Sequence, residues 1–253
     1  MSIADKLTTI ADNQQKVYDT GYEKGNQTGY DAGEAKGKED LLDSFWENYQ
    51  DKGKRTYYNG AFSYMTDEVF NPKYDIKPTQ ARYLFMFSRM TGSLPDRLKE
   101  LGITMDLSAD PSVMETFSNT GWTNIGEIYM PKATSGYGTF AFSNKLKVIE
   151  KLTFSDSFAW SSTFAGTKLQ RLIMGSKITK NGFDVQWSTE LSKESIISII
   201  NALSDTTTAL TVTLSKTAVN NAFETAKGNA DGSTSEEWAA LIATKQNWTI
   251  SLV

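Results

Sequence analysis

Residues 163–174, TFAGTKLQRLIM, decide the expected fold, because the same order of residues recurs through the middle of the chain. Each copy places a Phe beside small or polar residues and follows it with spaced apolar residues. The other copies are MFSRMTGSLPDRLKELGITMDLS (86–108), TFSNTGWTNIGEIYM (116–130) and AFSNKLKVIEKLTF (141–154). Their period of about 20 to 30 residues is typical of a solenoid with one short strand per turn.

Two sets of apolar residues align between these copies. The aligned phenylalanines are Phe87, Phe117, Phe142 and Phe164, and the alternating apolar pairs begin at Leu101, Ile128, Leu152 and Leu172. One turn cannot bury its own apolar edge. We therefore expect the turns to stack and their strands to form a mainly parallel sheet.

The stretches between the expected strands, such as 131–139 and 155–163, should project onto one face. Their Tyr, Trp, Ser and Gly content suits a contact surface. The candidate binding residues are Tyr137, Trp160 and Trp187. The alternative is that these aromatic side chains only fill the convex side of the solenoid.

The last third of the chain alternates between helical and strand patterns. The predicted elements are helices over 192–205, over 216–227 and within 228–245, and strands over 210–215 and 247–253. Ser192 is placed to cap the first helix, and Thr234 and Glu237 have the spacing of a capping box for the third. We expect this region to close the solenoid with a C-terminal cap of helices and strands.

Residues 1–52 indicate an oligomerising helix. The apolar seam of a coiled coil, with one polar layer at Gln14, is predicted at Ile3, Leu7, Ile10 and Val17. A row of glycines follows at strict four-residue spacing, at Gly21, Gly25, Gly29, Gly33 and Gly37. Because each Gly costs a lone helix about 1 kcal/mol, the row either packs against partner helices or belongs to a flexible linker. The strict spacing favours the oligomer.

The helix is expected to continue through Phe45 and Trp46, which would pack against the next domain, and to stop at Gly53. The aromatic, turn-rich residues that follow would seal the first turn of the solenoid. The expected domains are a helical oligomerisation and attachment stalk (1–52), an N-terminal cap (53–85) and the solenoid with its C-terminal cap (86–253).

Composition excludes several kinds of chemistry. The 253 residues contain no His and no Cys, which removes histidine-based nucleophile systems, thiolate metal sites and disulfides. The formal net charge of −4 and the lack of a basic run argue against nucleic acid as a partner. Acid pairs such as Glu190 with Glu194, or Asp106 with Asp110, are sparse. We expect a protein that is not an enzyme, with no cofactor and no metal.

Targeting signals are not visible. The first residues carry charges and amides instead of the apolar segment of a signal peptide. No stretch approaches the roughly 18 apolar residues of a membrane span. We expect a protein made in a cytoplasm, with no membrane insertion.

The two ends of the chain resemble known proteins. Residues 16–62, KVYDTGYEKGNQTGYDAGEAKGKEDLLDSFWENYQDKGKRTYYNGAF, resemble the N-terminal region of tail-associated proteins from phages and prophages of gut Firmicutes. The stretch from LSKESIISIINALSD to NWTISLV resembles their C-terminal region, and the middle is similar to BspA-like leucine-rich-repeat proteins. Where that family often carries a Cys, this chain has Thr120, Asn144 and Thr167 nearby.

The resemblance implies an α/β protein in which a coiled-coil stalk carries a leucine-rich-repeat-like solenoid with parallel strands. It also implies a structural or adhesive virion protein, a tail fibre or baseplate component, that forms a homo-oligomer, by family analogy a trimer. Its expected partners are other tail proteins and a host-surface glycan or protein. The alternatives are a bacterial leucine-rich-repeat adhesin or scaffold and a carbohydrate-degrading tailspike.

Overall fold

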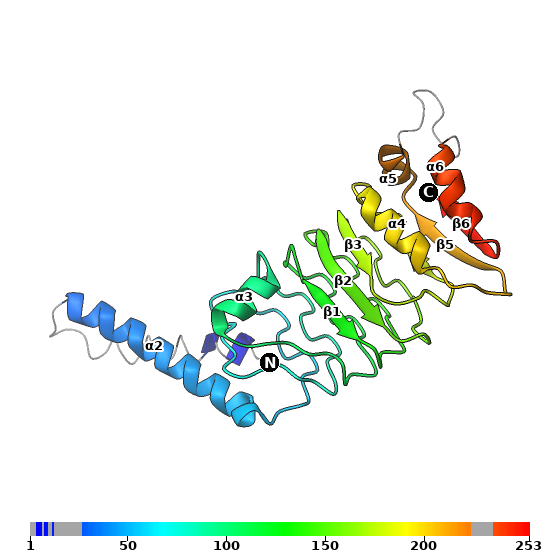
Figure 1. Cartoon of the computed structure of the whole chain (residues 1–253). Helices are drawn as coiled ribbons and strands as arrows, with labels where there is room; N and C mark the ends of the chain where they lie inside the picture. The colour runs from blue at the N-terminus through cyan, green and yellow to red at the C-terminus, as the bar shows by residue number, and fades with distance from the viewer. Residues whose placement is uncertain (1–3, 7, 10–11, 13–26, 224–234) are drawn as a thin grey trace.

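The computed structural model describes residues 4–6, 8–9, 12, 27–223 and 235–253. The helices are α2 (Gln27–Tyr49), the short 3-10 helix η1 (Asp51–Gly53), α3 (Leu94–Leu101), α4 (Lys193–Ala202), α5 (Lys216–Ala222) and α6 (Glu236–Ala243). The strands are β1 (Glu127–Met130), β2 (Val148–Phe154), β3 (Arg171–Met174), β4 (Phe183–Asp184), β5 (Leu210–Leu214) and β6 (Trp248–Leu252). From α2 onward these elements follow one another in chain order along the molecule (Figure 1).

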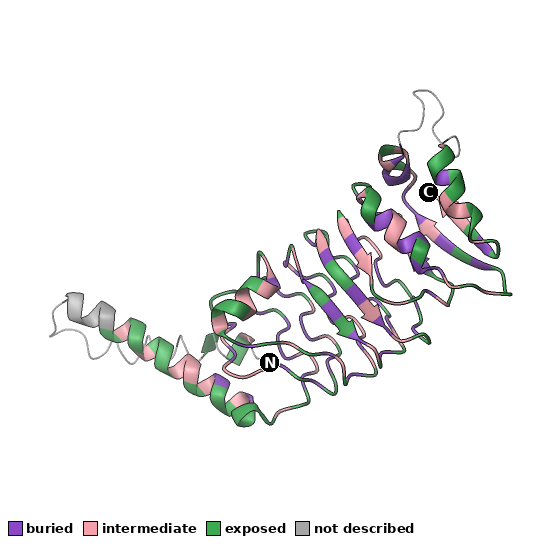
Figure 2. Cartoon of the chain, in the orientation of Figure 1, coloured by how far each residue is buried: buried purple, intermediate pink, exposed green. Residues whose placement is uncertain are grey.

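The strands form two separate parallel sheets of three strands each, β1-β2-β3 and β4-β5-β6. In the first sheet Ile128 pairs with Leu152, and Leu152 pairs with Met174 after a shift of register. Along β1 the buried Ile128 and Met130 alternate with the exposed Glu127 and Tyr129, and in β2 Ile149, Leu152 and Phe154 are buried, so one face of the sheet covers the core (Figure 2).

The expected fold class is wrong. The described residues form a mixed α/β structure with two small sheets, and they contain neither an extended solenoid nor a long coiled-coil stalk. The sheet stops at β3 because α4 packs against it and Ser195 and Ser198 accept the N–H groups of Leu172 and Met174, each at 2.9 Å. With its backbone donors bonded to hydroxyls, this edge no longer offers them to another strand.

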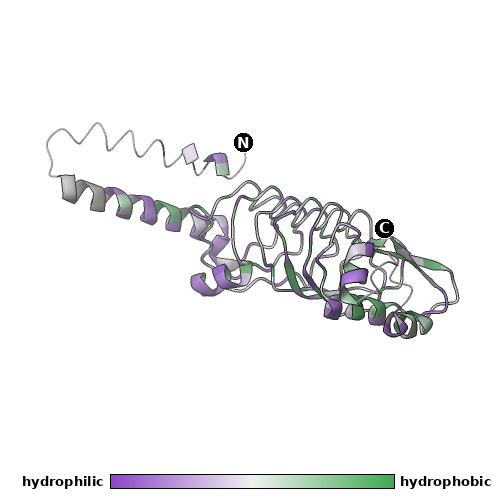
Figure 3. Ribbon diagram, turned by 90° about the horizontal axis from the view of Figure 1, so that it is seen from above, coloured by the Kyte–Doolittle hydropathy of each residue, from purple (hydrophilic) through white to green (hydrophobic). Residues whose placement is uncertain are grey.

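The coiled-coil seam cannot be compared with the structure. Ile3, Leu7, Ile10, Val17, Gly21 and Gly25 lie outside the described residues. Gly29, Gly33 and Gly37 lie within α2, which is one continuous helix seen projecting from the body of the molecule in Figure 3. The packing of the glycine row against partner helices stays a prediction, as does the division into three domains.

The C-terminal end of α2 anchors that helix to the rest of the molecule, as expected. The Trp46 ring is fully buried against Phe62 and Phe70, and its indole N–H donates to the Val69 carbonyl at 3.0 Å. The buried Gln50 side chain accepts from two backbone N–H groups, the nearer being that of Lys73 at 2.6 Å. These contacts join residues 46–50 to residues 62–74.

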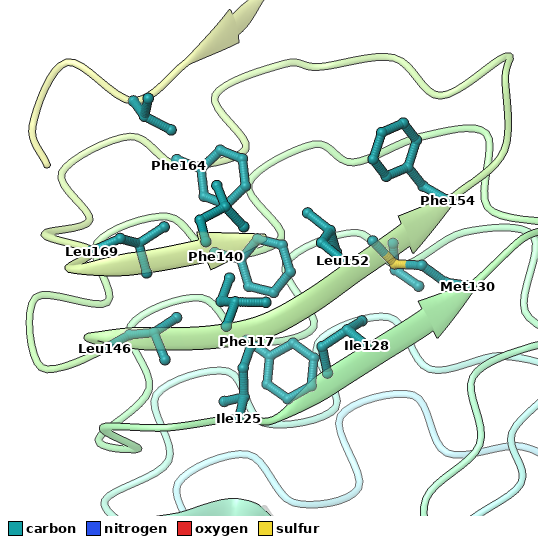
Figure 4. Packing of buried hydrophobic residues seen from close by; sticks show 14 of the residues in the cluster. Phe117, Ile125, Ile128, Met130, Phe140, Leu146, Leu152, Phe154, Phe164 and Leu169 are labelled. Carbon is teal, nitrogen blue, oxygen red and sulfur yellow. The ribbon is translucent and has the colours of Figure 1, made fainter. Parts of the chain in front are cut away.

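Five short turns stack beside one another in the middle of the chain. Each covers five residues, over 60–64, 83–87, 115–119, 138–142 and 162–166, and alternate residues donate their N–H to the next turn. The central residue of each turn is a buried phenylalanine: Phe62, Phe85, Phe117, Phe140 and Phe164. The rings from Phe85 to Phe164 are stacked with centroids 5.2 to 5.7 Å apart (Figure 4), within the range of favourable aromatic pairs.

The alignment of Phe87 and Phe142 with Phe117 and Phe164 is therefore wrong. Phe87 and Phe142 each lie two residues after the stacked Phe of their turn and are 39% and 64% exposed. Both turns contain two phenylalanines separated by one residue, and the left-handed backbone at Phe87 and Phe142 directs the second ring away from the stack. The period in the sequence could not tell which Phe of each pair is buried.

Threonines in three of these turns satisfy buried polar groups. Thr116, Thr139 and Thr163 donate their hydroxyls to carbonyls of the preceding turn at 2.9 to 3.0 Å. A buried hydroxyl without a partner would cost about 1–3 kcal/mol. The hydroxyls therefore help to hold successive turns in one register.

The predicted elements of the last third are present, with boundaries shifted by a few residues. Ser192 caps α4 as expected, because its hydroxyl accepts the N–H of Ser195 at 3.2 Å. The cap of α6 is Ser235, which accepts from Trp238. Thr234, the expected cap, lies outside the described residues.

Candidate binding surface

The first and last residues of the five turns have left-handed backbone conformations. The first residues are Gly60, Tyr83, Glu115, Gly138 and Ser162, with φ between 50° and 64°. The last residues are Tyr64, Phe87, Asn119, Phe142 and Gly166, with φ between 51° and 68°. Gly and Asn are the usual residues for this conformation, whereas bulky side chains there are strained. Three of the five last positions nevertheless carry an aromatic ring.

The last residues of the turns lie next to one another in space. Their N–H groups donate to the following turn, as Phe87 does to Ser118 at 3.0 Å and Asn119 to Ala141 at 2.8 Å. The Tyr64 and Phe87 rings are stacked with centroids 5.3 Å apart. The Phe142 ring lies against Gly166, where a Cβ atom would come within 3.2 Å of it. We call Tyr64, Phe87 and Phe142 the aromatic column.

Trp187 extends this column by one more turn. It follows Val185 and Gln186 and precedes Ser188, whose hydroxyl donates to the Thr167 carbonyl of the preceding turn at 3.1 Å. Trp187 is 53% exposed and precedes Ser188 as Gly166 precedes Thr167, so the hydrogen bond between Ser188 and Thr167 aligns Trp187 with Gly166. Gly166 lies between Phe142 and Trp187.

A groove of about 320 Å³ runs beside the aromatic column. Tyr64, Phe87, Arg89, Asn144 and Lys145 are among the residues that line it. Gly121 also lines the groove, and a Cβ atom there would lie 2.3 Å from the Met90 carbonyl oxygen. A side chain cannot be accommodated at this position without moving the backbone.

Basic side chains dominate the charge of the groove. Arg89 and Lys145 are exposed, and neither takes part in an ion pair among the described residues. Among the residues that the structure describes, no carboxylate lines this groove, although Asp5 lines the neighbouring hollow together with Arg89. The described lining of the groove therefore carries two basic side chains beside a stacked aromatic pair.

The predicted binding residues are not all on this surface. Tyr137 is 47% exposed, but it precedes Gly138 at the opposite end of its turn from Phe142. Trp160 is only 5% exposed and packs against Phe154, Phe158 and Phe183 with ring centroids 4.6 to 4.8 Å apart. The expectation that Trp160 lies on the contact surface is wrong, because its ring fills the core.

Reasoning from sequence missed Tyr64, Phe87 and Phe142. A signal was available at the last two, since LFMF (84–87) and TFAF (139–142) each contain two phenylalanines separated by one residue. Only one of them can enter the stack. The second was therefore a candidate for exposure.

The acid pairs do not face one another in an open site. Asp110 is buried and its two oxygens accept the N–H groups of Ala81 and Ser112 at 2.7 and 2.8 Å. Burial raises the pKa of Asp110 above its usual value. Glu190 accepts from Gln170, and Glu194 pairs with Arg171. These carboxyl groups serve structural contacts.

No protein-family model, curated protein or solved structure matches this chain. In the described part of the chain, none of the helices is both long and apolar enough to cross a membrane. The described residues also contain no cluster of acidic side chains arranged to hold a metal ion.

Proposed function

We propose that this chain is a structural and adhesive protein of a bacteriophage tail, a fibre or baseplate component that contacts the host surface through the aromatic column. The proposal rests on the backbone conformation of Tyr64, Phe87 and Phe142. A left-handed conformation costs a non-glycine residue about 1–2 kcal/mol, and each of these rings leaves a large part of its surface exposed, between 39% and 64%. Strain of this kind is concentrated at functional sites.

The last residues of the other two turns show what the same backbone position requires. Asn119 and Gly166 adopt the same conformation with side chains that favour it. An aromatic residue is therefore not needed to make the turn. Exposed aromatic rings on a rigid framework are instead typical of binding surfaces, because they lose little conformational freedom on contact.

The association with a phage particle is supported by the resemblance of both ends of the chain to phage tail-associated proteins. Under this proposal the chain is made in the host cytoplasm and assembled into the tail as a homo-oligomer, a trimer by analogy with that family. Its other partners are neighbouring tail proteins and a host-surface glycan or protein. An antibody against the chain should label the tail of particles recovered after lysis.

Adhesion can be measured with fluorescently labelled protein and cells of the bacterium in which the phage propagates. The double variant Phe87→Gly, Phe142→Gly should bind these cells at least about ten-fold more weakly, since lost aromatic contacts of ~1 kcal/mol or more add across the two positions. Glycine suits the backbone at both positions, so the variant should remain folded.

The matched control is Tyr129→Gly, which removes an equally exposed ring from strand β1, away from the column. It should bind cells as the unmodified chain does. Equal adsorption by the double variant and the unmodified protein would show that the column is not the adhesive surface.

A further inference from the structure

We propose that the groove lined by Tyr64, Phe87, Arg89 and Lys145 binds a polyuronate, a chain of sugars that each carry a carboxylate. This inference rests on the proposed function and names the chemical class of the surface ligand. Three properties of the groove support this inference: a stacked pair of aromatic rings, amide side chains without hydrogen-bond partners among the described residues, and two positively charged side chains.

The stacked pair of aromatic rings fits the apolar face of a sugar ring. Tyr64 and Phe87 are nearly parallel, with 17° between their planes, and both are partly exposed. A pyranose ring has one or both faces formed by C–H groups, and these pack on aromatic rings as other apolar surfaces do. Because Tyr64 already covers one face of the Phe87 ring, the contact would use the other face of Phe87, beside Asn119, which lines the same groove.

The amides provide partners for sugar hydroxyls. Asn119 and Asn144 line the groove, and both are exposed. Within the part of the chain that the structure describes, neither side-chain amide has a hydrogen-bond partner. Each amide offers both a donor and an acceptor, which is what a hydroxyl group needs. By contrast, the hydroxyls of Ser88 and Thr120 are buried and bonded to each other at 2.8 Å.

The positive charges select an acidic sugar over a neutral one. Arg89 and Lys145 carry two full charges, and no carboxylate among the described residues lines the groove. Arg89 follows the turn 83–87 and Lys145 follows the turn 138–142, so the two charges come from segments on either side of the intervening turn 115–119. A ligand that carries several carboxylates can contact both charges at once, which a ligand with a single carboxylate cannot do. The guanidinium of Arg89 also suits the planar carboxylate.

The test compares two probes that differ only in charge, hexagalacturonate and its fully methyl-esterified form, by calorimetry on the full chain at neutral pH and low salt. The acidic probe should bind about ten-fold more tightly, because its carboxylates attract the charges of Arg89 and Lys145 and the esters do not. The double variant Arg89→Gln, Lys145→Gln should abolish this preference. Lys132→Gln, an exposed lysine outside the groove, serves as the matched control and should keep it.

Outcomes separate this inference from the proposed function. Equal binding of both probes, or a preference that survives the loss of Arg89 and Lys145, would overturn the polyuronate site while leaving adhesion through the aromatic column intact. Binding of neither probe by a chain that still adsorbs to cells would also overturn it, and would point to a protein receptor. Absence of cell adsorption would instead overturn the proposed function.

Discussion

At the scale of single residues, the aromatic column combines backbone strain, which lowers the stability of the fold, with aromatic rings exposed at the surface. Phe142 has a φ of 58° and is 64% exposed, whereas Gly166 serves the same position in the next turn. The backbone therefore accepts a strained residue where an unstrained one is sterically possible. The ring makes a contact with Gly166 inside the chain, and its large exposed area is available for contacts with a binding partner.

Replacing Phe142 by Gly should stabilise the protein by about 0.5–1 kcal/mol, because relief of left-handed strain exceeds the entropic cost of glycine. Thermal unfolding followed by circular dichroism measures the change as a rise in Tm. The same substitution at Tyr129, in strand β1, should lower the Tm, since a strand loses stability with glycine. A fall in Tm for Phe142→Gly would mean that its contact with Gly166 outweighs the strain.

At the scale of elements, the five turns are held together by two sets of side chains. The stacked phenylalanines supply apolar burial, and the threonines beside three of them bond to the preceding turn. Both sets depend on side chains from separate turns being level with one another. Removing one of these side chains should therefore also weaken the packing of the neighbouring turns.

Phe140→Ala should destabilise the protein by about 3–5 kcal/mol, the usual cost of deleting a buried aromatic ring. Urea unfolding followed by tryptophan fluorescence measures this loss. Phe142→Ala, two residues away, is the matched control and should change stability by less than about 1 kcal/mol, because its ring is exposed. Similar losses at both positions would contradict the assignment of Phe140 to the stack.

The contact between α4 and β3 also determines where the first sheet ends. The period of the sequence predicts another strand beside β3, but the serines of α4 bond to its backbone instead. Ser192, Ser195 and Ser198 recur at three-residue spacing, which a helix places on one face. The pattern was visible in the sequence, but only the structure assigns the last two to a sheet edge.

At the scale of the whole molecule, α2 projects from one end, and one face of its last turns packs against the body through the buried Trp46 (Figure 2). Truncation at Gly53 would remove Trp46 and expose the rings that it covers. A truncation that starts at Lys38 instead removes the glycine row and keeps Trp46. The chain that starts at Lys38 therefore tests whether the glycine row is needed for oligomerisation without removing the Trp46 contacts that the fold needs.

The full chain should be an oligomer, and the chain that starts at Lys38 should be a folded monomer. Multi-angle light scattering gives the mass of each, and circular dichroism checks that the shorter chain is folded. A monomeric full chain would show that the glycine row does not support association. An oligomer that persists without the first 37 residues would place the interface elsewhere.

The sequence by itself determined the helices and strands of the last third, the serine cap of α4, the burial of Trp46 and the exclusion of histidine and cysteine chemistry. These depend on residues close in the chain or on composition alone. The tertiary structure decided which Phe of each closely spaced pair enters the stack, that Trp160 is buried, and that the first sheet ends at β3. Each of these depends on backbone direction at a turn or on a partner more than twenty residues away, and a local pattern of apolar residues carries no information about either.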